Sequence, residues 1–86
     1  MIASYFTGEL MVTLFNRINE NKDYVNGVKF DYNNHKLLVE YQPVQKQIAL
    51  VDTKTKKEYK VCTIPVEDME KDYISFILKT IIDKNF

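Results

Sequence analysis

The sequence predicts an α+β fold in which a helix, a four-stranded antiparallel meander and a second helix follow one another in a single small domain. In the central segment, apolar residues alternate with polar ones in four short runs, and turn-forming residues separate these runs. The segments before and after it carry apolar residues at helical spacing. We therefore expect one domain over residues 1–86, with both helices packed on the same face of the sheet.

The first helix is expected from about residue 4 to residue 21. Its apolar residues recur every three or four positions and form one stripe: Leu10, Met11, Leu14, Phe15 and Ile18. Ser4 or Thr7 could supply the N-cap, and Glu9 would then lie in or near the first turn, at the positive end of the helix dipole. Asn26 and Gly27 predict a turn into the first strand.

Four strands are expected in the central segment, at about residues 28–32, 37–42, 47–52 and 58–64. Successive side chains of a strand point to opposite faces, so Phe30, Val39 and Leu50 share the face that the helices would cover. Three tyrosines fall on the same face: Tyr32, Tyr41 and Tyr59. A covered face favours a place for them at the rim of the core over a base-stacking platform.

The turns also predict how the strands pair. Turns centred on residues 34–35, 44–45 and 54–55 place Phe30 opposite Val39, Val39 opposite Leu50, and Leu50 opposite Tyr59. Two pairs of opposite charge favour the same registers: Lys29 with Glu40, and Asp52 with Lys57. All three hairpins then agree on one apolar face, which a slip of one residue would destroy.

The other face of the sheet is expected to be mostly polar, with a modest apolar strip. The strip would contain Leu38, Ala49, Val51, Cys62 and Ile64. Leu38 lies directly opposite Val51 in the predicted register. Contiguous exposed strips of this kind are often interaction sites.

The second helix is expected from about residue 66 to residue 83, after Pro65 ends the fourth strand. The residues expected to face the core are Val66, Met69, Tyr73, Ile77 and Ile81, and four more apolar residues widen this stripe: Ile74, Phe76, Leu78 and Ile82. One sheet cannot cover so wide an arc. The first helix or a second copy of the chain would have to cover the rest.

Charge is regional in a chain whose net charge is zero. The segment 54–60 has a balance of +3, from Lys54, Lys56, Lys57 and Lys60 against Glu58. The segment 67–72 has a balance of −3, from Glu67, Asp68, Glu70 and Asp72 against Lys71. Acidic residues at a helix start usually complement its dipole, although they could also contact a cation or mimic nucleic-acid phosphate. Lysines at a hairpin tip are usually solvated, although they could also contact phosphate.

Composition also indicates the setting of the protein. One cysteine cannot form an internal disulfide, which fits a reducing compartment. The chain shows no signal peptide and no apolar run long enough to span a membrane, so a cytoplasmic protein is expected. Eleven lysines against one arginine, with many Asn, Ile and Tyr residues, indicate AT-rich coding and thus a low-GC bacterium or its phage.

The residues that usually carry catalysis or bind cofactors do not form a pattern here. His35 is the only histidine and lies in a turn without potential metal ligands nearby in the sequence, so a solvated turn residue is expected. Cys62 has no neighbouring Cys or His and is expected to be a small buried residue. Gly8 and Gly27 are too far apart for a phosphate-binding loop. We therefore expect no enzyme, no metal and no cofactor.

Two functional hypotheses remain. The first is a protein-binding module, which could be a phage or mobile-element inhibitor that occludes its partner and could form a homodimer. Its expected interface residues are Phe76, Leu78, Ile82, Leu38 and Val51. The second is a nucleic-acid-binding module that uses Lys54, Lys56, Lys57 and Lys60. The acidic residues Glu67, Asp68, Glu70 and Asp72 could contact a partner in place of the lysines.

Overall fold

The computed structural model describes residues 1–21, 23–63 and 71–86. The elements are α1 (Ser4–Glu20), β1 (Asn26–Tyr32), β2 (His35–Gln42), β3 (Gln47–Asp52), β4 (Glu58–Thr63) and α2 (Lys71–Asn85). Their order confirms the predicted α+β arrangement of helix, four strands and helix. Ile64, expected at the end of the last strand, and residues 66–70, expected in the second helix, lie outside the described residues.

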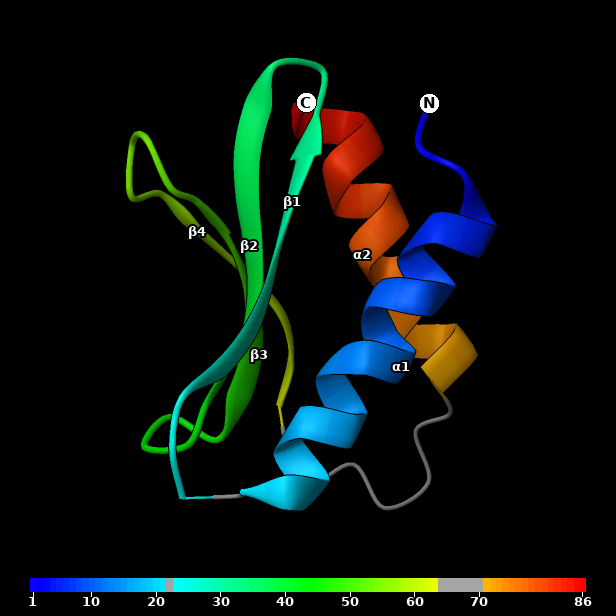
Figure 1. The fold of residues 1–86 in the computed structure, drawn as a ribbon. Helices are drawn as coiled ribbons and strands as arrows, with labels where there is room; N and C mark the ends of the chain where they lie inside the picture. The colour runs from blue at the N-terminus through cyan, green and yellow to red at the C-terminus, as the bar shows by residue number, and fades with distance from the viewer. Residues whose placement is uncertain (22, 64–70) are drawn as a thin grey trace.

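The four strands form one antiparallel sheet in the order β1-β2-β3-β4, so each strand pairs with its neighbours in the sequence. Both helices lie side by side on one face of this sheet, as predicted (Figure 1). α1 packs against α2 and covers β1 and β2, whereas α2 packs beside β4. The molecule therefore consists of a helical layer and a sheet, with the hydrophobic core between them.

Two of the three predicted registers are confirmed, because Val39 pairs with Leu50 and Leu50 pairs with Tyr59. The register of the first hairpin was wrong by two residues: Phe30 pairs with Leu37, and Val39 pairs with Val28. The cause is the turn, which consists of Asn33 and Asn34 with φ values of 47° and 65°. Asparagine adopts this left-handed conformation readily, which allows a tight two-residue turn. Lys29 therefore lies opposite Leu38, not Glu40.

The pairing of β3 with β4 contains a β-bulge. Ala49 pairs with Lys60 but Ile48 pairs with Cys62, so Val61 is the additional residue on β4. The bulge breaks the alternation, and both Val61 and Cys62 belong to the hydrophobic core. The expectation that Cys62 lies on the face away from the helices was therefore wrong, whereas its burial was predicted correctly.

α1 buries the predicted apolar stripe, with Leu10, Met11, Leu14 and Ile18 buried and Phe15 half-buried. The predicted N-cap was wrong, because the helix begins after Ala3 and no side chain caps it. Thr7 instead lies fully buried, where its hydroxyl donates to the Ser4 carbonyl and accepts from Ser75. Glu9 lies beyond the first turn.

α2 faces the core with a different stripe from the predicted one. Ile74, Leu78 and Ile82 are fully buried, whereas Tyr73 is 57% exposed. Ile77 and Ile81 are half-buried at the edge of the core. The helix packs against α1 as well as against the sheet, and this second contact decides which residues point inward. Val66 and Met69, also expected in the inward stripe, lie outside the described residues.

Candidate protein-binding surfaces

Of the three residues of the second helix expected to bind a partner, only Phe76 is on the surface. Its side chain is 64% exposed, whereas Leu78 and Ile82 are completely buried within the same chain. The expectation that these two residues offer surface to a partner was therefore wrong. α1 covers the width of apolar surface that the sheet alone could not cover.

The face of the sheet away from the helices is less apolar than expected. Val51 is only 9% exposed, Leu38 is half-buried and Ala49 is fully buried. A polar network lies across this face. The Gln42 amide donates to the carboxylates of Glu40 (2.8 Å) and Glu58 (2.7 Å), and the Gln47 amide donates to Gln42 (2.7 Å). An open apolar strip is therefore not present among the described residues of this face.

Four large side chains are exposed on the side of the helices that is opposite to their buried stripes. Tyr5 (79% exposed) and Val12 (42%) lie two turns apart on α1, and Tyr73 and Phe76 lie one turn apart on α2. Figure 1 shows that both helices form one layer over the sheet. We infer from this layer and from the exposure of the four side chains, which lie opposite the buried stripes, that they face away from the sheet. We call Tyr5, Val12, Tyr73 and Phe76 the outer helical face.

Sequence reasoning found only Phe76 of this set. The stripe of α1 could have revealed Tyr5 and Val12, because these residues lie opposite Leu14 and Ile18 on a helical projection. Tyr73 was assigned to the core instead. Its true position depends on how α2 is rotated against α1, which helical spacing alone does not determine.

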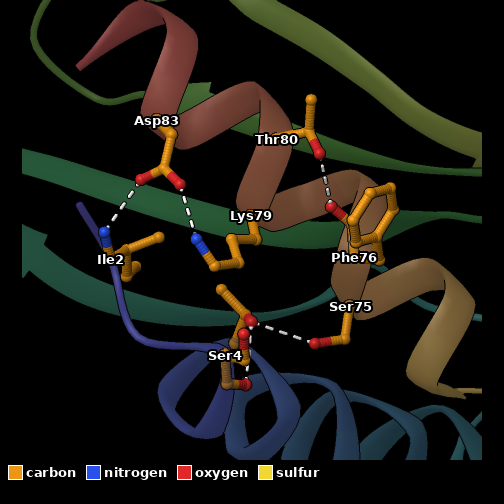
Figure 2. A network of polar contacts seen from close by, with 8 residues as sticks. Ile2, Ser4, Ser75, Phe76, Lys79, Thr80 and Asp83 are labelled. Atoms are coloured by element: carbon orange, nitrogen blue, oxygen red, sulfur yellow. Dashed lines mark hydrogen bonds and ion pairs between the residues drawn. The ribbon is translucent and has the colours of Figure 1, made fainter.

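Polar contacts hold the two helices in register beneath the outer helical face (Figure 2). The Ser75 hydroxyl is directed toward α1 and donates to Thr7 (2.9 Å). At the end of α2, Asp83 accepts from the Ile2 backbone amide (2.8 Å) and pairs with Lys79 (2.7 Å). The hydrogen bonds from Lys79 and from Ile2 lower the pKa of the Asp83 carboxyl. These contacts fix the relative position of the exposed side chains on the two helices.

The hairpin between β3 and β4 presents the predicted lysines to solvent: Lys54, Lys56, Lys57 and Lys60 are all exposed. Asp52 stabilises the turn, because its carboxylate accepts from the backbone amides of Lys54 (3.0 Å) and Thr55 (3.4 Å). The first of these hydrogen bonds is the main cause that lowers the pKa of Asp52. Within residues 1–21, 23–63 and 71–86, none of the four lysines forms an ion pair. The ammonium of Lys57 lies 5.1 Å from the centre of the Tyr59 ring.

The predicted acidic group can be placed only in part. Asp72 is exposed in the first turn of α2, where a negative charge is favourable. Glu67, Asp68 and Glu70 lie outside the described residues.

The remaining candidates for chemistry are packed against apolar neighbours. His35 is half-buried at the start of β2, with its ring centre 4.9 Å from that of Phe86. It is therefore not the fully solvated turn residue that was expected. Burial raises the pKa of the Cys62 thiol, which disfavours the reactive thiolate. Tyr32 and Tyr59 are packed at the edge of the core, as expected, whereas Tyr41, also expected at the rim, is buried in the core.

Two adjoining hollows lie near the turn between β1 and β2, with volumes of about 390 and 310 Å³. Asp31 and Lys36 line both hollows, and their charged groups are 3.6 Å apart. No group of three metal-binding side chains is found in the part of the chain that the structure describes. In the same part, neither helix is long and apolar enough to cross a membrane.

The comparisons with known proteins do not add to these observations. No protein-family model, no curated protein and no solved structure matches the chain.

Proposed function

We propose that this protein is a small non-catalytic protein-binding module that recognises its partner through the outer helical face. The observation that carries the proposal is the exposure of Tyr5, Val12, Tyr73 and Phe76 on one side of two adjacent helices. Aromatic residues are enriched at protein interfaces, where their burial contributes much of the binding free energy. The contacts of Thr7 with Ser75 and of the Ile2 backbone amide with Asp83 hold the face in one arrangement before binding, which reduces the entropic cost of association.

The mode of action that we propose is occlusion, in which the module covers a functional surface of its partner. The high ratio of lysine to arginine fits AT-rich coding, as in a low-GC bacterium or its phage, and the origin that we propose is a phage or mobile element. The partner would be a protein of the host-cell cytoplasm.

Charge introduction into the outer helical face tests the proposal. The variant with Tyr5→Asp and Phe76→Asp should keep its circular dichroism spectrum, because both side chains are exposed, but its Kd for the partner should rise at least about a hundredfold. Val44→Asp is the matched control, since Val44 is 89% exposed in the turn between β2 and β3. A partner captured by the wild-type protein would be identified by mass spectrometry and measured by titration calorimetry. Equal binding by the double variant and the control would contradict the proposal.

A second candidate function is nucleic-acid binding at the hairpin between β3 and β4. It is supported by the exposed lysines that lack acidic partners among the described residues, next to the Tyr59 ring. Fluorescence anisotropy with oligonucleotides at low salt tests it. Lys54→Glu and Lys56→Glu together should abolish binding. Lys46→Glu is the matched control, because Lys46 has a positive φ like Lys56 but lies in another turn, and this variant should bind like the wild-type protein. Wild-type binding that is absent or insensitive to salt would exclude this function.

A further inference from the structure

β1 is an edge strand whose free side is suited to pair with another strand. Within the described part of the chain, it has a neighbour on one side only. Its seven residues pair with β2 without interruption and contain no proline. β4, at the opposite edge, carries the bulge at Val61, a feature that commonly prevents further pairing. Among the residues that the structure describes, the edge formed by β1 is therefore the only one that is regular over its whole length.

The hairpin register shows which backbone groups of β1 point outward. Tyr32 and His35 flank a two-residue turn, so they form a hydrogen-bonded pair, and such pairs alternate with pairs that are not hydrogen-bonded. The backbone groups of Gly27, Lys29 and Asp31 therefore point away from β2. A contact agrees with this assignment: the Gly27 carbonyl accepts a hydrogen bond from the Arg17 side chain of α1.

The side chains at the outward-pointing positions carry opposite charges. Lys29 and Asp31 are both exposed, on the sheet face away from the helices. If a second β1 strand pairs antiparallel with Lys29 opposite Asp31 of the partner subunit, two-fold symmetry places Asp31 opposite Lys29 of the partner subunit. The neighbouring symmetric registers would instead place two lysines or two aspartates opposite each other, which is unfavourable. The strand is therefore self-complementary in one register.

We propose that two copies of this chain form a homodimer through β1, with Lys29 of each copy opposite Asp31 of the other, in a continuous eight-stranded sheet. Lys29 and Asp31 of each copy form four backbone hydrogen bonds with the partner strand in this register. Gly27 lies beyond them, so its contact with Arg17 marks the position where the pairing ends.

The helix-facing side of β1 also favours this register. Phe30 lies on the two-fold axis, opposite Phe30 of the partner subunit. The Phe6 ring packs edge-to-face on Phe30, with 5.7 Å between ring centres, and is 37% exposed. Dimerisation covers this exposed part with the partner helix, so the interface combines a polar contact on one face of the sheet with an aromatic contact on the other.

This inference rests on the proposed protein-binding function, because a second copy of the chain is one such protein partner. The dimer contact, however, lies on β1 and not on the outer helical face. Tyr5→Asp with Phe76→Asp tests the outer helical face, and substitutions at residues 29 and 31 test the edge of β1. A negative result for the outer helical face therefore does not decide whether β1 forms the dimer, and a negative result for β1 does not decide whether the outer helical face binds a partner.

Analytical ultracentrifugation of charge-reversal variants tests the dimer, with concentrations from about 1 μM to about 1 mM. We expect the wild-type protein to dimerise in this range. Lys29→Asp and Asp31→Lys should each raise the dimer Kd at least about tenfold, because each places like charges opposite each other at two positions. An equimolar mixture of the two variants should dimerise again, because every opposed pair is then of opposite charge. Lys60→Asp, on the same sheet face but on β4, is the control and should dimerise like the wild-type protein.

The mixing experiment separates a lost contact from a lost fold, since an unfolded variant would not recover on mixing. A wild-type protein that stays monomeric at every concentration overturns the proposal. The free edge of β1 would then be a site for an extended segment of a different protein. A dimer that persists in both single variants also overturns it, because the contact then lies elsewhere.

Discussion

Leu78→Ala tests the position of α2 against the rest of the molecule. Leu78 is fully buried in the middle of the inward stripe, one turn from both Ile74 and Ile82. Truncation of a fully buried leucine costs about 2–5 kcal/mol, because transfer free energy is lost and a cavity remains. A domain of this length has a free energy of unfolding of about 4–13 kcal/mol, so the variant should lose a large part of its stability.

Urea denaturation followed by circular dichroism measures this loss. The midpoint should fall while the slope m stays constant, and a loss of about 3 kcal/mol should lower Tm by roughly 15 °C in a domain of this size. Phe76→Ala and Tyr73→Ala are the matched controls on the exposed side of α2, and each should change stability by less than about 0.5 kcal/mol. Should Tyr73→Ala destabilise the protein as much as Leu78→Ala, the described orientation of α2 would be refuted in favour of the stripe expected from the sequence.

Further substitutions probe the helices and the first strand. Thr7→Val leaves the buried Ser75 hydroxyl without its acceptor and should lower the free energy of unfolding by about 1–3 kcal/mol. Ser75→Ala should cost less, because the Thr7 hydroxyl still donates to the Ser4 carbonyl when Ser75 is replaced. Equal costs of the two substitutions in urea denaturation would argue against the contact between Thr7 and Ser75. Gly8→Ala should raise stability by about 0.5–1 kcal/mol, since the new methyl group meets no atom within 4 Å in the helix. Gly27→Ala should lower Tm, because its Cβ would lie 3.2 Å from the Val39 carbonyl oxygen, and thermal melts that rank these two variants in the opposite order would contradict the packing. The lowered pKa of Asp83 means that its contribution is present above the pKa of the unfolded chain, about 3.9, and is lost as pH falls through the lower folded-state pKa. Asp83→Asn should therefore reduce the drop in Tm below about pH 4, and an unchanged drop would show that its contacts do not contribute.

The strands could be predicted from the sequence because their signal is local. Alternation placed Val39 and Leu50 on the covered face, and a register error of two residues in the first hairpin did not change that face. The error arose because Asn33 and Asn34 form a tighter turn than expected. The bulge at Val61 could not be foreseen, since the residues around it alternate as they would in a regular strand.

The candidate surfaces were harder to predict, because exposure depends on contacts between distant segments. Leu78 and Ile82 look like surplus apolar surface until α1 is placed beside α2. Val51 looks exposed from the alternation alone, yet it is only 9% exposed in the folded sheet. Exposure of the hairpin lysines was correctly expected, because a charged residue in a tight turn has few ways to become buried.

The two proposed contacts reinforce each other through the symmetry of the dimer. The two-fold axis of an antiparallel strand pair within one sheet is perpendicular to the sheet, so both helical layers remain on the same side. The outer helical faces of both copies would then point in the same direction and could bind two partner molecules on one surface. Linked binding of this kind raises apparent affinity by about a hundredfold or more when the geometry fits both sites. Lys29→Asp, which separates the copies, should therefore weaken binding to a densely immobilised partner far more than binding to the same partner in dilute solution. An equal loss in both formats would show that the dimer does not present its two faces together.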